Sequence, residues 1–118
     1  MKLVSDTPKS KARCIYKLEF PDGSFYIGST IKFRQRMSGY KSAFKNSRGA
    51  VNMLISNKAR EFNTATFNIL LKVPEGVNLR EAEDEYIKIN ATNPFLLNRS
   101  RSAFSNSGMI KKQVKYVV

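Results

Sequence analysis

The 118-residue chain contains no histidine and no tryptophan, and its one cysteine is Cys14. Without histidine there is no imidazole general base, no Ser-His-Asp triad and no histidine-ligated zinc or iron. A lone cysteine excludes an internal disulfide and a cysteine-rich zinc site, which favours a reducing, cytoplasmic setting. Any hydrolysis by this chain would therefore have to use carboxylate, tyrosine, lysine or metal-bound water.

Long apolar runs are also missing. The first 13 residues hold no apolar stretch of signal-peptide length, and no segment approaches the roughly 20 apolar residues of a membrane span. We therefore expect an intracellular protein with no membrane association. The length predicts one domain. We expect a basic, flexible arm over residues 1–12, a folded domain over 13–99 and a basic extension over 100–118.

Acidic residues are scarce, with 9 Asp and Glu against 21 Lys and Arg, a formal net charge of +12. Such an excess favours a polyanionic partner through electrostatic steering and counterion release. Nucleic acid is the first candidate and an acidic membrane surface the second. Five of the nine acids lie within residues 75–85, which leaves the rest of the chain more basic still.

A β-hairpin is predicted near the start of the domain. Residues 14–20 are mostly β-formers, Pro21-Asp22-Gly23 is a strong turn signal, and residues 24–27 resume the apolar and aromatic pattern. Each strand presents one tyrosine, Tyr16 in the first and Tyr26 in the second. Both tyrosines could simply pack in the core with a wet hydroxyl.

A helix is predicted after Gly28, with Ser29 or Thr30 as its N-cap. Four apolar residues recur at helical spacing and form its core-facing stripe: Phe33, Met37, Tyr40 and Phe44. By helical angle, Arg36 lies about 70° from the centre of this stripe, at the edge of the buried face. Lys41 flanks the stripe on its other side, and Arg34 and Lys45 point further out; for these three a solvated surface and a phosphate contact are both open. Arg48, in the following loop, is a further candidate for DNA contact.

The later elements expected are a second helix over residues 51–62, a central strand buried on both sides over 64–73 and a helix over 79–89. Lys58 is expected to extend past the core to water. A short edge strand is expected over 113–118. In the last helix Glu83 falls inside the apolar face, where a carboxylate is costly unless it is paired or binds a cation. Ile89 is expected in that face, whereas the other charges should point away: Glu81, Asp84, Glu85 and Lys88.

Cys14-Ile15-Tyr16 followed by Tyr26-Ile27-Gly28-Ser29-Thr30, with Arg36 ten residues after Tyr26, resembles the GIY-YIG nuclease superfamily. The likeness continues with a strand at residues 67–71, with Glu83 three residues before Tyr86-Ile87, and with Asn98 beyond that helix. Together these matches extend over residues 14–98.

The resemblance implies an α/β (α+β) domain with a small three-stranded antiparallel sheet flanked by helices. It also implies a metal-dependent DNA endonuclease, in the manner of homing, restriction or repair enzymes. Five residues would converge on the sheet face: Tyr16, Tyr26, Arg36, Glu83 and Asn98. Glu83 would hold one Mg²⁺ or Mn²⁺ ion, and Arg36 would grip the scissile phosphate.

For the proton of the attacking water, the first candidate acceptor is Tyr16, with a pKa lowered by nearby cations, and the second is Tyr26. Asn98 is expected to order the site. Cys14 replaces the usual glycine of the family signature. Ser29 stands where some members have lysine, and Tyr40 where many have histidine.

Other interpretations stay open. Glu83 could form a buried ion pair with an arginine, and the chain could be a catalytically inactive DNA- or RNA-binding module with a vestigial site. We expect a monomer in solution, with a dimer possible on DNA, because no heptad or dimerisation helix is present and the charge opposes self-association.

Overall fold

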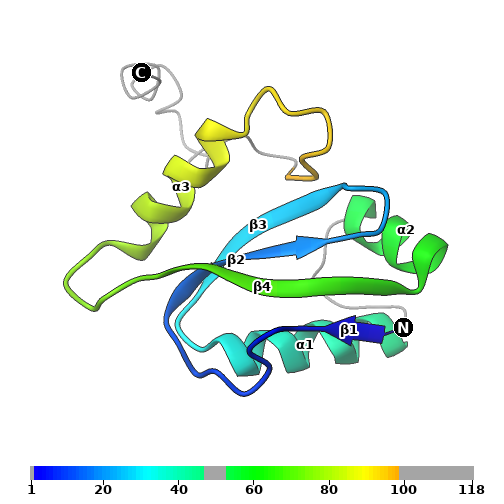
Figure 1. Ribbon diagram of the computed structural model, residues 1–118, viewed down its shortest axis with the longest axis horizontal. Coiled ribbons are helices and arrows are strands. Elements are labelled where there is room, and N and C mark those ends of the chain that lie inside the picture. The colour runs from blue at the N-terminus through cyan, green and yellow to red at the C-terminus, as the bar shows by residue number, and fades with distance from the viewer. Residues whose placement is uncertain (1, 47–52, 99–118) are drawn as a thin grey trace.

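The computed structural model describes residues 2–46 and 53–98 (Figure 1). Four strands and three helices follow one another along this part of the chain: β1 (Lys2–Val4), β2 (Cys14–Glu19), β3 (Phe25–Thr30), α1 (Phe33–Asn46), α2 (Met53–Phe62), β4 (Thr64–Lys72) and α3 (Leu79–Ile89). None of these helices is long and apolar enough to cross a membrane.

The strands form one mixed sheet in the order β1-β4-β2-β3. β2 pairs antiparallel with both β3 and β4, as expected, but β1 adds a fourth strand parallel to β4. The α+β class is therefore confirmed, and the expectation of three antiparallel strands is wrong. The sequence of β1 gives too weak a signal, because only Leu3 of its three residues is buried and its partner strand lies about 60 residues away.

The core divides into two clusters, one on each face of the sheet. Alternate residues of β2 point to opposite faces, so Tyr16 joins the cluster formed with α1 and α2, whereas Ile15 joins the cluster formed with α3. Figure 1 shows α3 and α1 on opposite sides of the strands. Residues of β3 divide in the same way, and this alternation decides which side chains can meet.

The predicted apolar stripe of α1 is confirmed: Phe33, Met37 and Tyr40 are buried, and Phe44 packs against the same cluster. The predicted cap is wrong, because Ser29 and Thr30 still belong to β3. The chain needs two more residues to turn from the sheet into the helix. The Thr30 hydroxyl accepts a hydrogen bond from the Lys32 N–H (3.1 Å) within this turn.

The buried side of α3 is rotated from the predicted one. Ile87 is buried, but Ile89 is 77% exposed, and Asp84, expected to face solvent, is only 6% exposed. The Asp84 carboxylate is tolerated there because Lys88 Nζ lies 2.9 Å from it, one helical turn away. Asn78 caps the start of the helix by accepting the Glu81 N–H (3.0 Å).

β4 is central in the sheet, as predicted, yet it is not buried on both sides. Leu70 is 38% exposed and Leu71 43% exposed, because α3 packs mainly against β3 and β2. α2 buries Ile55 and Ala59 against the sheet. The first residues of the predicted second helix, the loop at 47–49 and the strand at 113–118 lie outside the described residues.

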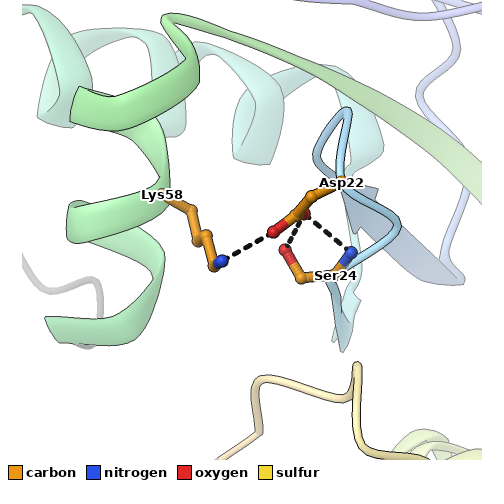
Figure 2. A network of polar contacts seen from close by, with 3 residues as sticks. All are labelled: Asp22, Ser24 and Lys58. Atoms are coloured by element: carbon orange, nitrogen blue, oxygen red, sulfur yellow. Dashed lines mark hydrogen bonds and ion pairs between the residues drawn. The ribbon is translucent and has the colours of Figure 1, made fainter.

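A polar network fixes the hairpin turn to α2 (Figure 2). Asp22 Oδ1 accepts hydrogen bonds from the Ser24 N–H (2.9 Å) and the Ser24 hydroxyl (2.5 Å), and Lys58 Nζ lies 2.6 Å from Asp22 Oδ2. The hydrogen bond from Lys58, followed by those from Ser24, lowers the pKa of Asp22 to about 2. Lys58 therefore has a carboxylate partner, where the sequence predicted a side chain extending to water.

Candidate active site

Tyr16 and Gly28 lie directly across from each other on β2 and β3. The Tyr16 ring occupies the space above Gly28, where a Cβ atom would lie 2.3 Å from the tyrosine hydroxyl oxygen. On its other sides the ring packs against Phe67, with 4.7 Å between ring centroids, and against Tyr40, with 6.0 Å. The glycine therefore creates the room in which Tyr16 is held.

Arg36 extends from α1 to the hydroxyl of Tyr16. Its Nη1 donates a hydrogen bond of 3.4 Å to Tyr16 Oη, and its guanidinium carbon lies 6.0 Å from the centre of the same ring. The residue is exposed overall. One nitrogen of the guanidinium is thus held by the protein while the residue stays accessible to solvent, as an anion-binding arginine requires.

The Tyr16 hydroxyl also lies 2.9 Å from the hydroxyl of Tyr40, which is buried. Burial raises the pKa of Tyr16 to about 12, and it outweighs the opposing hydrogen bond from Tyr40 and the charge of Arg36. Burial likewise raises the pKa of Tyr40. The expectation that nearby cations lower the pKa of Tyr16 is therefore wrong, because desolvation is the larger effect.

Tyr26 lies on the same face of the sheet and is only half-buried. Burial raises the pKa of its phenol, the negative charge of Glu83 raises it further, and the positive charge of Arg36 opposes both. Tyr26 is therefore within electrostatic range of both charged residues, which links the two halves of the predicted site.

Glu83 approaches from α3, on the other side of β3. Its carboxylate accepts a hydrogen bond from the Ser29 hydroxyl. Within residues 2–46 and 53–98, no hydrogen bond or ion pair joins Glu83 to Arg36 or to either tyrosine, nor does any arginine pair with it. The structure therefore brings Tyr16 and Arg36 into direct contact, keeps Tyr26 within electrostatic range of both, and connects Glu83 to them only across β3.

Asn98 completes the outer edge of β3. The preceding residues continue the sheet, with hydrogen bonds from the Phe25 N–H to the Phe95 carbonyl (2.9 Å) and from the Leu97 N–H to the Phe25 carbonyl (2.7 Å). The buried Asn98 side chain then accepts the Ile27 N–H (2.9 Å) and donates to the Ile27 carbonyl (2.8 Å). Its amide thus imitates a peptide group, which is an ordering role.

The structure also adds residues that the sequence pattern did not assign to the site. Ser29, expected as a helix cap, instead donates a hydrogen bond to Glu83, and Tyr40, expected in the core stripe, bonds to Tyr16. The family resemblance marked both positions only as places where other members carry lysine or histidine. The sequence offered one hint for each residue: Ser29 has a hydroxyl near the end of a strand, and Tyr40 has a hydroxyl in a buried stripe. The predicted DNA-contacting cations Arg34, Lys41 and Lys45 are exposed on α1, and Arg48 lies outside the described residues.

Glu83 and Ser29 are the residues of this site that could hold a divalent cation, and they suit one mode of coordination. Across the described ranges, no group of three or more His, Cys, Asp or Glu side chains comes together. Mg²⁺ commonly binds proteins through one or two carboxylates, with water and substrate phosphate completing its shell. Glu83, with the Ser29 hydroxyl beside it, suits that mode and does not suit a cage made of protein ligands alone.

Comparisons with protein-family models, curated proteins and solved structures found no match to this chain.

Proposed function

We propose that this protein is a Mg²⁺- or Mn²⁺-dependent DNA endonuclease of the GIY-YIG type, a phosphodiester hydrolase. The observation that carries the proposal is the Tyr16–Arg36 pair built over Gly28. Tyr16, Gly28 and Arg36, all part of the family resemblance, meet there, and Arg36 is accessible to solvent. The excess of positive charge supports a polyanionic substrate.

Arg36 binds the scissile phosphate. Two of its features suit this role: the bond to Tyr16 restrains the guanidinium, and a solvent-accessible guanidinium can donate to two phosphate oxygens at once. The charge that builds up on those oxygens during hydrolysis is stabilised by a donor that is already in place. Arg34, on the other flank of α1, has no such partner in the site.

Tyr26 is the better candidate for proton acceptor. The pKa of about 12 keeps Tyr16 protonated at neutral pH, so its hydroxyl positions Arg36. Tyr26 is less buried, and part of the rise in its pKa comes from the charge of Glu83. When the charge of Glu83 is neutralised, it no longer raises the pKa of Tyr26, and the ionised form of the Tyr26 phenol is favoured.

Glu83, held by Ser29, is the residue that would bind the metal ion. When bound, the ion supplies positive charge that stabilises the leaving oxygen. Asn98 keeps β3, and with it Gly28 and Ser29, in place by pairing with the Ile27 backbone.

A second function is favoured by one observation: Glu83 and Arg36 lie on opposite faces of the sheet, and no hydrogen bond or ion pair joins them in the described part of the chain. A protein with that separation could bind DNA or RNA without cutting it. With either function we propose a cytoplasmic setting, which is consistent with the buried thiol of Cys14. We also propose a monomer in solution that can form a dimer on DNA.

The test is digestion of supercoiled plasmid with Mg²⁺ and with EDTA. We expect nicked circles first and linear DNA later, only with the metal ion, because each chain carries one set of site residues. Glu83→Gln should abolish cleavage while it leaves folding and DNA binding intact. Glu85→Gln is the matched control, since Glu85 is exposed on the same helix. Metal-independent cleavage, or wild-type turnover by Glu83→Gln, would refute the metal-ligand role, and binding without cleavage would support the second function.

A further inference from the structure

Helix α1 carries its cations on two separate flanks. Arg36 lies on the flank that faces Tyr16 and Tyr26. By the rotation of 100° per residue, a second set lies on the opposite side of the buried stripe, in a row about 16 Å long: Arg34, Lys41 and Lys45, all exposed. One phosphate group bound at Arg36 cannot also reach this row, so the row is available for a different part of the polyanion.

The surface between the two flanks is uncharged. Gln35, Ser38, Gly39 and Ser42 occupy it, and all are exposed. α1 contains no acidic residue at all, whereas the shorter α3 contains four. A solvent-facing helix in a globular protein usually mixes both signs of charge. The charge pattern of α1 is therefore complementary to a partner with two negative walls and a polar floor.

Gly39 adds a second observation. Glycine is a poor residue for a helix interior, and a Cβ atom at this position would meet nothing within 4 Å. No packing inside the described structure therefore calls for glycine here. Because glycine has no side chain, it leaves the backbone of α1 uncovered at this point of the outer surface, where another molecule could approach the helix closely.

We propose that α1 docks into the major groove of B-form DNA, with Arg36 toward the phosphates of one strand and the row of Arg34, Lys41 and Lys45 toward those of the other. A helix with its side chains is about 10–12 Å across. The major groove is about 12 Å wide and the minor groove about 6 Å, so only the major groove admits the helix. That the strand at Arg36 is the one cut rests on the proposed function, but the docking itself does not.

The same dimensions exclude double-stranded RNA as the favoured partner, because the major groove of A-form RNA is too narrow and deep for side chains to reach its bases. The predicted preference is therefore for duplex DNA over duplex RNA of the same length and sequence.

The first experiment measures binding of the full chain to a 30-base-pair DNA duplex in EDTA, so that cleavage does not enter. The triple variant Arg34→Gln/Lys41→Gln/Lys45→Gln is compared with Lys2→Gln/Arg60→Gln/Lys72→Gln, which removes the same charge from exposed positions off α1. We expect at least a tenfold loss of affinity for the first triple and a smaller loss for the second. The slope of log affinity against log salt should become shallower by about 0.9 for each phosphate that the variant no longer neutralises. Equal losses in the two triples would overturn the proposal.

The second experiment identifies the groove. Methyl green, which occupies the major groove, should displace the protein, and netropsin, which occupies the minor groove, should not. Gly39→Gln should weaken binding severalfold and Gly39→Ala much less, with circular dichroism to show that both variants are folded. Displacement by netropsin alone, tighter binding to the RNA duplex, or full affinity in Gly39→Gln would each contradict groove docking. Because no readout involves cleavage, an inactive protein would refute the proposed function and leave this inference standing.

Discussion

Gly28 lies across from Tyr16 in the β2–β3 ladder, so close that an added Cβ atom would fall 2.3 Å from the tyrosine hydroxyl oxygen. The tyrosine has no room to withdraw, because Phe67 and Tyr40 pack against its other sides. The position of the phenol, and with it the direction of Arg36, therefore depends on the absence of a side chain at residue 28.

Gly28→Ala should accordingly destabilise the fold by about 1–3 kcal/mol, the usual cost of overpacking a core. Urea unfolding measures the change in the free energy of unfolding. Gly39→Ala is the control, since its Cβ would meet nothing and the loss of a helical glycine should raise stability by up to about 1 kcal/mol. A stability for Gly28→Ala equal to that of the wild type would show that Tyr16 can move.

Asn98→Asp should destabilise the protein by about 1–3 kcal/mol. A carboxylate still accepts the Ile27 N–H, but it cannot donate to the Ile27 carbonyl, which would then face a second acceptor. Asn93→Asp is the matched control, because among residues 2–46 and 53–98 Asn93 uses only its oxygen, to accept the Phe95 N–H. If thermal melts of both variants coincide, the amide of Asn98 does not act as a strand substitute.

The Asp22–Lys58 contact should stabilise the fold in a pH-dependent way. The pKa of Asp22 is lowered from 3.8 to about 2, so the contribution is present above the unfolded pKa and is lost as the pH falls through about 4 to 2. Asp22→Asn should therefore be less stable than the wild type at pH 6, and the two proteins should converge near pH 2. Denaturant unfolding at several pH values measures this, and a constant difference down to pH 2 would contradict the contact.

The rate of cleavage should rise with pH if Tyr26 accepts the proton. Burial and the charge of Glu83 raise the pKa of Tyr26. Below its pKa, the ionised fraction of a phenol grows about tenfold for each unit of pH. Tyr26→Phe should flatten this rise in single-turnover rates. Tyr16→Phe should lower the rate but keep the slope, since Tyr16 positions Arg36. The opposite pattern would return the role of base to Tyr16.

Arg36→Ala should reduce the rate of cleavage at saturating protein by roughly 10³ or more, the scale of other arginines that clamp a transferring phosphoryl group. Arg36→Lys should recover little, since an ammonium group lacks the planar fork. Arg34→Ala should weaken DNA binding yet leave the rate at saturation close to that of the wild type. A larger effect of Arg34→Ala on that rate would mean that the wrong arginine has been assigned.

Local patterns in the sequence were sufficient for much of the fold. The turn at Pro21-Asp22-Gly23 and the spacing of Phe33, Met37 and Tyr40 are set by residues close together in the chain, and both predictions are confirmed. The pairing of Tyr16 with Gly28 likewise follows from the hairpin register. For the site, the family resemblance implied that Tyr16 and Arg36 lie together, and in the structure Arg36 donates a hydrogen bond to the Tyr16 hydroxyl.

The tertiary structure decided those features that depend on contacts between residues far apart in the sequence, or on the balance of several opposing effects. The strand at Lys2–Val4 exists because β4 offers it an edge, and the buried side of α3 is centred toward Asp84 because Lys88 compensates the carboxylate. The pKa of Tyr16 is raised because desolvation by the packed core exceeds the effect of one nearby guanidinium. Only the folded chain could show that Glu83 reaches β3 from the face opposite Arg36, since which face a helix covers depends on the whole path of the chain.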